Sequence, residues 1–226
     1  MWPFKKSIEK SGLLNGFTDY HCHILPGVDD GFETLEDSLA ILKRYEEVGI
    51  STVWLTPHIM EDMPNTTADL KVRYQELKAA YEGPIVLHLA SENMLDNIFE
   101  QRLGDNDFLP LGESGQYLLV ETSYYNPPMG FEQILSKIKS AGYFPVLAHP
   151  ERYMYMNFKK YTALKEQGIL FQLNLFSLTG QYGSYVRTTA EKLYKKGMYN
   201  FAGTDLHCIE VFNDMVRSAV DIKFPL

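Results

Sequence analysis

The sequence predicts an α/β fold of parallel strands, and three observations support this prediction. Seven short runs of β-branched, aromatic and other apolar residues recur along the 226-residue chain. Segments with apolar residues three and four positions apart, typical of amphipathic helices, lie between most of these runs. Helical segments that stop at a glycine shortly before the next strand are typical of βα repeats. No low-complexity linker divides the series, so we expect a single domain over residues 1–226, with residues 1–16 as an N-terminal extension.

The seven runs are predicted to be buried strands, each with a helix that returns the chain to the same edge of the sheet. They cover residues 17–21, 52–56, 85–90, 117–121, 145–149, 169–174 and 199–205. The average spacing of about 32 residues matches the length of a βα unit. An open doubly wound sheet and a closed barrel both fit this pattern. They differ in where ligands bind: at a switch point in the sheet, or at the C-terminal ends of nearly all barrel strands.

Two segments illustrate the predicted helices. The first has its apolar stripe at Leu35, Leu39, Leu42 and Tyr45 and starts with a capping box formed by Thr34 and Asp37. The second has its stripe at Phe131, Ile134, Leu135, Ile138 and Ala141. Glycines end four of the helical stretches: Gly49, Gly142, Gly168 and Gly197.

Composition excludes several classes of protein. The 21 basic and 29 acidic residues give a net charge of -8, which disfavours binding to a nucleic-acid backbone. Only Cys22 and Cys208 occur, so a reducing, cytoplasmic location is expected rather than a disulfide framework. The N-terminus has no apolar core of signal-peptide length, and no stretch of 18 apolar residues predicts a membrane span. Trp2 and Phe4 offer too little area to hold a membrane surface, so we expect a frayed terminus there.

Polar side chains follow six of the seven predicted strands, where the active face of a barrel would lie. His21 and His23 alternate onto one side at the end of the first strand, and a turn with two aspartates, PGVDDG, follows. Scattered surface charge would not align with strand ends in this way. Oxygen and nitrogen ligands without thiolates suit Mn²⁺, Zn²⁺, Fe²⁺ or Mg²⁺, the first two above all. The nine candidate ligands are enough for three ions that share a bridging carboxylate: His21, His23, Asp30, His58, Glu92, Glu121, His149, Asp205 and His207.

These motifs resemble the polymerase and histidinol phosphatase (PHP) superfamily. The resemblance rests on HCH at 21–23, DDG at 29–31, TPH at 56–58, the two strand-end glutamates, AHPERY at 148–153 and TDLH at 204–207. Within that superfamily, PGVDDG together with HPERY resembles the bacterial tyrosine-protein phosphatases of capsule and exopolysaccharide gene clusters. The match runs from about residue 19 to 207. It implies a distorted (β/α)7 TIM-like barrel of PHP type with a trinuclear metal centre, for which Mn²⁺ is the expected metal.

The resemblance also implies roles for individual residues. His21, His23, Glu92 and Asp205 would hold the first ion; Glu92, Glu121 and His149 the second; Asp30, His58 and His207 the third. Arg152 matches the phosphate-binding arginine of the family, as expected of a guanidinium that pairs two phosphoryl oxygens. One feature departs from the pattern: the family carries an arginine and prolines after the last histidine, whereas CIEVF follows here at 208–212 and the chain ends at Leu226. A second substrate arginine is therefore left open, as is a truncated or variant C-terminus.

Four tyrosines in loops after ligand-bearing strands are candidates to stack on a substrate ring, although ordinary packing explains any one of them as well: Tyr124, Tyr125, Tyr153 and Tyr155. His88 lies inside its strand, so we expect it in the core or behind the ligands rather than on a metal. A cysteine-based phosphatase is excluded because an arginine must follow the cysteine by six positions, where Val28 and Asp214 stand.

The function that the resemblance implies is metal-dependent hydrolysis of phosphotyrosine. The implied partner is the tyrosine-rich tail of a bacterial kinase that controls polysaccharide export. A phosphatase of histidinol phosphate or another small phosphomonoester is the closest alternative, because the same centre would cleave an alkyl phosphate. An exonuclease is disfavoured by the negative charge, and a metal-dependent amidohydrolase would need a lysine where Glu121 stands. A non-catalytic module that binds phosphotyrosine is the alternative from another class. The oligomeric state is left open.

Overall fold

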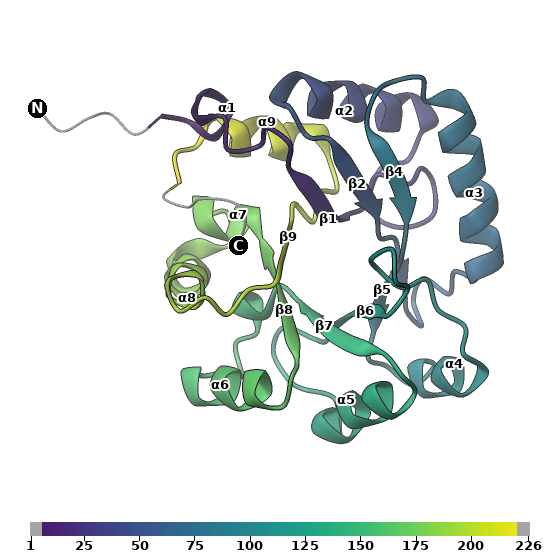
Figure 1. The fold of residues 1–226 in the computed structure, drawn as a ribbon, viewed down its shortest axis with the longest axis vertical. Coiled ribbons are helices and arrows are strands. Elements are labelled where there is room, and N and C mark those ends of the chain that lie inside the picture. Colours follow the sequence, from purple (N-terminus) through teal and green to yellow (C-terminus); the bar gives the residue numbers. More distant parts are fainter. Residues whose placement is uncertain (1–5, 221–226) are drawn as a thin grey trace, which may run out of the picture.

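The computed structural model describes residues 6–220, so the expectation for Trp2 and Phe4 lies outside the described residues. The chain forms an α/β fold in which parallel strands occupy the centre and helices surround them (Figure 1). The strands are β1 (Thr18–Cys22), β2 (Thr52–Leu55), β3 (His58–Ile59), β4 (Val86–Leu89), β5 (Glu92–Met94), β6 (Tyr117–Glu121), β7 (Phe144–Ala148), β8 (Leu170–Asn174) and β9 (Phe201–Gly203). The α/β fold with parallel strands is therefore confirmed.

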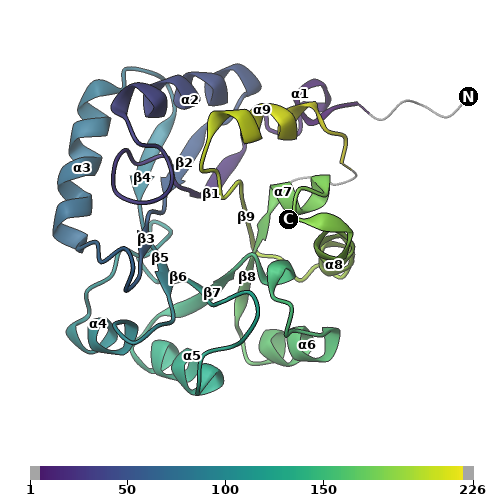
Figure 2. The same ribbon diagram turned by 180° about the vertical axis from the view of Figure 1, so that it is seen from behind.

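Helices alternate with the strands along the chain and lie outside the curled sheets in both views (Figures 1 and 2). They are α1 (Ile8–Ser11), α2 (Leu35–Val48), α3 (Thr67–Ala80), α4 (Phe99–Asp105), α5 (Phe131–Ser140), the 3-10 turn η1 (Pro150–Arg152), α6 (Phe158–Glu166), α7 (Leu175–Thr179), α8 (Gly183–Lys195) and α9 (Ile209–Arg217). Among residues 6–220, no helix is long and apolar enough to cross a membrane.

The capping signals read from the sequence act as predicted. The Thr34 side chain accepts a hydrogen bond from the Asp37 backbone N–H and starts α2, and Gly49 ends the helix in the left-handed region at φ 90°. The inward faces of the two helices predicted in detail are confirmed in part. Leu42 and Tyr45 of the predicted α2 stripe are buried, whereas Leu35 and Leu39 are half-buried. The α5 stripe is buried from Phe131 to Ile138, but its last predicted member, Ala141, lies just after the helix and is exposed.

The strands pair as two parallel sheets, where the sequence suggested one series of seven strands. One sheet has the order β1-β2-β4, and the other has the order β3-β5-β6-β7-β8-β9 and curls into a half-barrel (Figures 1 and 2). The strands predicted at 52–56 and 85–90 end at Leu55 and Leu89, and after a break at residues 56–57 and 90–91 each is followed by a further short strand, β3 or β5. Pro57 lacks the backbone N–H that ladder pairing needs, so the break at that position has a direct cause. A closed seven-stranded ladder is therefore not what the pairing shows.

The two sheets meet at the ends of β1 and β9. The Asp205 backbone N–H donates to the His21 carbonyl (2.6 Å), and the His23 N–H donates to the Leu206 carbonyl (3.0 Å). The buried Asp19 carboxylate accepts from the Thr204 backbone N–H (2.9 Å) and from its hydroxyl (2.7 Å). These bonds bring the first and last parts of the fold together, and with them the motifs that follow β1 and β9.

Both faces of the central strands are buried. Leu118 and Val120 of β6 enter one large cluster of buried apolar side chains that extends from Ile8 to Val216, whereas Leu119 packs in a smaller cluster with Trp54. Successive side chains of a strand point to opposite faces, so this alternation places apolar residues on both sides of the sheet, as parallel sheets require. The polar residues at the strand ends therefore stand out from an apolar frame.

Candidate metal centre

The predicted ligands come together at the C-terminal ends of the strands. Seven of them line one cavity of about 150 Å³, in which Tyr124, Arg152 and Tyr182 are the other lining residues: Asp30, His58, Glu92, Glu121, His149, Asp205 and His207. His21 and His23 are fully buried beside this cavity. The convergence follows from the topology, because parallel strands place their C-terminal ends at one edge.

An inner group consists of His21, His23, Glu92 and Asp205, whose donor atoms all lie within 4.8 Å of one another. Glu92 Oε2 lies 3.1 Å from His21 Nε2 and 3.4 Å from His23 Nε2. Asp205 Oδ1 lies 3.4 Å from the first of these nitrogens and 3.3 Å from the second. This group has the same members as the set that the sequence resemblance implies for the first ion.

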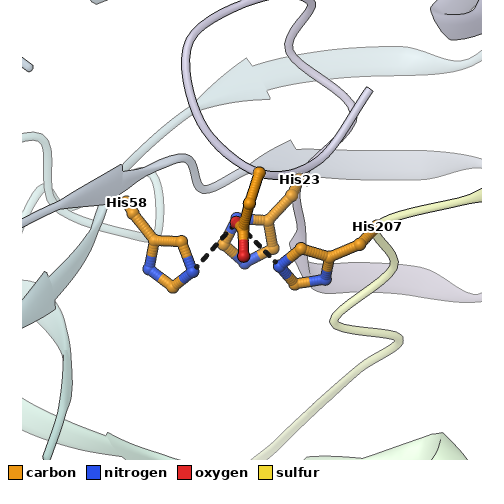
Figure 3. Close-up of side chains that lie close together, drawn as sticks. His23, His58 and His207 are labelled. Atoms are coloured by element: carbon orange, nitrogen blue, oxygen red, sulfur yellow. Dashed lines mark ion pairs between the residues drawn. The ribbon is translucent and has the colours of Figure 1, made fainter. Parts of the chain in front are cut away.

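An outer group consists of His23, Asp30, His58 and His207. Figure 3 shows the three imidazoles of this group turned toward one another. Asp30 Oδ1 lies 3.6 Å from His58 Nε2 and 3.3 Å from His207 Nε2. The Asp30 side chain is 55% exposed, so this group opens to solvent while the inner group does not. It contains the set implied for the third ion, with His23 in addition.

A middle group brings His58 together with Glu92 and Glu121. His58 Nδ1 lies 3.2 Å from Glu92 Oε2 and 3.1 Å from Glu121 Oε1. The resemblance assigns His149 to this pair of carboxylates, and His149 Nε2 lies 3.1 Å from Glu92 Oε1 and 3.9 Å from Glu121 Oε2. Glu92 thus contacts at least one histidine of every group, namely His21, His23, His58 and His149.

The cluster is strongly coupled electrostatically. Burial alone would lower the pKa of His21, but the carboxylates of Glu92 and Asp205 outweigh burial and raise it to about 9. Burial would raise the pKa of Glu92, yet the surrounding imidazoles hold it well below its usual value. The hydrogen bond with His207 lowers the pKa of Asp30 to about 2. Ionised carboxylates and cationic charge thus stabilise one another at this place.

Four buried polar atoms of the cluster make no hydrogen bond: His149 Nδ1, and three atoms held only by the ion-pair contacts described above, His58 Nδ1, Glu92 Oε2 and Glu121 Oε1. Buried polar groups are normally satisfied, so such atoms need an explanation. His149 and Asp205 also adopt left-handed backbone conformations, with φ of 32° and 51°, and strained conformations of this kind cluster at functional sites. Nitrogen and carboxylate donors without thiolates fit hard or borderline divalent cations, so the residues present fit a centre of divalent metal ions.

Arg152 lies on the rim of the cluster between two aromatic rings. Its guanidinium carbon lies 4.4 Å from the Tyr124 ring centroid and 4.2 Å from that of Tyr182, and Nη1 lies 2.6 Å from Asp205 Oδ2. Among the residues that line the cavity, Arg152 is the only lysine or arginine. Desolvation would lower its pKa, but the nearby Asp205 raises it, so Arg152 stays cationic. The arrangement presents a fixed positive fork to the cavity.

The predicted aromatic candidates take different places. Tyr124 lines the cavity. Tyr125 is 73% exposed, and Tyr153 is fully buried, with its hydroxyl accepting from the Thr122 backbone N–H (3.2 Å). The Tyr155 hydroxyl lies 2.6 Å from Thr122 Oγ1, and this ring does not line the cavity. Only Tyr124 of these four therefore lies next to the arginine.

The strand for which the sequence offered no ligand supplies amides in place of one. Gln172 Oε1 lies 3.0 Å from His21 Nδ1 and accepts from the His149 backbone N–H (3.1 Å). Asn174 Nδ2 donates to Asp205 Oδ2 (2.9 Å). A Cβ on Gly203 would lie 2.5 Å from the Cβ of His21, so only glycine allows this approach. Polar residues that alternate within an apolar strand were the signal for these two amides.

Two further residues near the cluster were not singled out as site residues from the sequence. Tyr182 follows the short helix α7, and its ring packs on the face of the Arg152 guanidinium opposite Tyr124. Asp29 accepts a hydrogen bond from His23 Nδ1 (2.8 Å), whereas the sequence analysis predicted only its neighbour Asp30 as a ligand. His88 stacks on Trp54 at 4.4 Å and belongs to none of the three groups, as expected for a residue inside its strand.

A curled parallel sheet that gathers histidines and carboxylates at its strand ends defines an α/β protein with a candidate metal centre. More particularly, the chain belongs to the family "Capsular polysaccharide synthesis, CpsB/CapC", whose family model matches residues 17–221. The resemblance found in the sequence is thereby confirmed.

Individual relatives agree with this assignment. Tyrosine-protein phosphatase YwqE of Bacillus subtilis (strain 168) is 29% identical over 208 residues, which is 89% of this chain and 82% of the relative. Tyrosine-protein phosphatase CpsB of Streptococcus pneumoniae is 25% identical over 215 residues, covering 90% of this chain and 88% of the relative. A solved structure from work on these two proteins, described as unique metal-dependent tyrosine phosphatases, matches with a TM-score of 0.79 at 27% identity. That match covers 90% of this chain and 82% of the solved one.

Proposed function

We propose that this protein is a metal-dependent protein-tyrosine phosphatase that acts in capsular or exopolysaccharide synthesis. The observation that carries the proposal is the buried cluster of imidazoles and carboxylates, several of whose polar atoms make no hydrogen bond, beside the guanidinium of Arg152. Membership of the capsule-synthesis family and similarity to tyrosine-protein phosphatases support the same activity.

The cofactors of this proposal are three divalent ions, with Mn²⁺ the first choice and Fe²⁺, Zn²⁺ and Mg²⁺ the others. Glu92 would bridge the first and second positions, because it lies near His21 and near His149. The assignment taken from the sequence is kept: His21, His23, Glu92 and Asp205; Glu92, Glu121 and His149; Asp30, His58 and His207. Three divalent charges outweigh four carboxylates, so the loaded pocket would attract a phosphate monoester dianion in spite of the acidic net charge.

When bound, such ions supply a water of lowered pKa as nucleophile and positive charge near the phosphoryl oxygens. Arg152 binds equatorial phosphoryl oxygens through its guanidinium fork, held flat between Tyr124 and Tyr182. Tyr124 offers its ring to the tyrosine of the substrate. A phenol leaves with a pKa near 10, so its departure needs less help from a general acid than an alcohol would. Burial raises the pKa of Cys22 well above its usual value, which agrees with a reaction that uses no cysteine nucleophile.

The remaining parts of the proposal concern the setting of the reaction. The substrate is the tyrosine-rich tail of a kinase that controls polysaccharide export, and the reaction takes place in the cytoplasm. The fold is one domain over residues 1–226, a distorted (β/α)7 barrel. The continuous apolar cluster from Ile8 to Val216 supports one domain, and the bonds between β1 and the residues after β9 support closure of the barrel.

The proposal is tested by phosphate release from a phosphotyrosine peptide and from histidinol phosphate, measured side by side with added Mn²⁺ and after exhaustive chelation. Metal-dependent release from the peptide, with little from histidinol phosphate, is the expected result. Release from histidinol phosphate alone would assign the centre to alkyl phosphates. An intact peptide that stays bound to the metal-loaded protein would instead indicate a binding module.

A further inference from the structure

Asp29 is the buried neighbour of the exposed ligand candidate Asp30. Its side chain is fully buried, whereas that of Asp30 is 55% exposed. Asp29 Oδ2 accepts hydrogen bonds from His23 Nδ1 (2.8 Å) and from the His58 backbone N–H (3.0 Å), and Oδ1 accepts from the Gly31 N–H (3.0 Å). Both oxygens are therefore used by protein donors, and Asp29 does not line the cavity of the metal cluster.

The bond to His23 fixes how that imidazole faces the cluster. When Nδ1 carries the hydrogen that Asp29 accepts, the lone pair for a metal ion is on Nε2. That nitrogen lies 3.3 Å from Asp205 Oδ1 and 3.4 Å from Glu92 Oε2, on the side of the candidate ligands. Asp29 thus sets both the tautomer and the ring orientation of His23.

The same carboxylate connects three of the four members of the outer group. It bonds the side chain of His23 and the backbone of His58, and it directly precedes Asp30 in the chain. The fourth member, His207, stacks on the His23 ring at a centroid distance of 4.0 Å and an angle of 20°. Among the side chains of residues 6–220 that lie outside the cluster, Asp29 alone bonds both His23 and His58.

The loop that carries Asp29 is tied to β3 a second time. Asn65 Nδ2 donates to the Val28 carbonyl and to the His58 carbonyl, at 2.8 Å each. A Cβ on Gly31 would lie 2.1 Å from the His23 carbonyl oxygen, so the turn is pressed against the strand end. Two other members of the inner group have supports of their own from β8, namely Gln172 on His21 and Asn174 on Asp205.

We propose that Asp29 is a positioning residue for two of the three ion positions: the first, whose ligand His23 it bonds through the side chain, and the third, outer one, whose ligand His58 it bonds through the backbone and whose ligand Asp30 it precedes. The proposal rests on the metal-dependent site proposed above, but it concerns ion retention and not the reaction. It predicts that loss of the Asp29 carboxylate weakens these two positions, whereas the position of Glu121 and His149 stays filled.

The test compares Asp29→Asn with the parent protein. Both are loaded with Mn²⁺ and dialysed against increasing concentrations of chelator, and the Mn²⁺ ions retained per chain are then counted by elemental mass spectrometry. Asparagine has the same shape, but one of its ends is an amide that faces an N–H donor in either orientation. The expected result is weaker retention of the first and third ions, each with about 10- to 100-fold lower affinity, while one ion per chain is retained as in the parent; a loss of this size is typical when a residue supporting a ligand is lost. Asp62→Asn is the matched control, because Asp62 is an exposed carboxylate on the neighbouring loop and belongs to no ligand group.

An unchanged ion count and affinity in folded Asp29→Asn would overturn the proposal, and so would loss of all ions at once. If Asp29→Asn does not fold, as judged by circular dichroism, Asn65→Ala is measured in the same way. This variant removes the other tie between the loop and His58, and parental retention of the outer ion in it would also overturn the proposal. The count requires no substrate, so a parent that binds ions without hydrolysing phosphotyrosine would refute the proposed function while leaving this test intact.

Discussion

Replacement of Arg152 tests the proposed phosphate-binding role most sharply. The guanidinium lies between the rings of Tyr124 and Tyr182 and forms a 2.6 Å contact with Asp205. Each charge-assisted hydrogen bond contributes about 1.5–3 kcal/mol. Two such bonds to the phosphoryl group in the transition state amount to about 3–6 kcal/mol, which corresponds to a loss of about 100- to 10,000-fold in kcat/KM for Arg152→Ala. Arg152→Lys keeps the charge but not the fork, so we expect a loss of roughly 10-fold or more.

The assay measures kcat/KM on a phosphotyrosine peptide for both variants together with the number of ions per chain. The ion count is needed because Arg152 also contacts Asp205, a predicted ligand. Arg187→Ala is a suitable control, since Arg187 is half exposed on α8 and pairs with Glu191. Parental kcat/KM in Arg152→Ala at parental metal content would refute the reasoning.

Three further predictions concern reactivity, stability and pH. Iodoacetamide at neutral pH should leave Cys22 unmodified, because burial raises its pKa. Stoichiometric labelling of Cys22 itself in the folded protein, located by peptide mass spectrometry, would contradict this. Tyr45→Phe removes the hydroxyl that donates to the buried Asp19 carboxylate at 2.9 Å, so the free energy of unfolding in urea should fall by about 1.5–3 kcal/mol. An unchanged urea midpoint would count against it. Burial lowers the pKa of His88, so the unfolded chain takes up this proton first as the pH falls below about 6.5. The stability contribution of His88 is therefore present above this pH and lost below it. In His88→Phe, the free energy of unfolding should depend less steeply on pH in this range. An NMR titration midpoint for His88 above 6.5 would disprove the shift.

Sequence reasoning predicted the elements well where local chemistry decides them. The cap at Thr34, the stop at Gly49 and the apolar stripes of α2 and α5 are set by neighbours along the chain. The gathering of ligands at one edge follows from parallel topology, which fixes where strand ends meet. The joining of β1 to the residues after β9 could not be read in the same way, because it depends on bonds between residues far apart in the chain.

Residues that support the ligands escaped prediction for the same reason. Gln172 and His21 are 151 positions apart, and nothing in either neighbourhood marks them as partners. Tyr182 follows a short helix that the strand and helix pattern does not require. Tyr153 is a residue for which the sequence suggested a role that the structure does not support. Its loop position suggests access to substrate, but tertiary packing buries it fully. The break of the sheet at Pro57 was visible as a proline, but its effect on pairing depends on the partner strand.

The central claim is that phosphotyrosine hydrolysis depends on ions held by this cluster. Its most direct test is to titrate Mn²⁺ into chelated protein and to record bound ions and phosphate release from a phosphotyrosine peptide in the same samples. The account predicts that activity is absent without ions, rises as the cluster fills and fails to return in Glu92→Gln. Full phosphate release by the ion-free protein, or by Glu92→Gln with its ion sites empty, would contradict it.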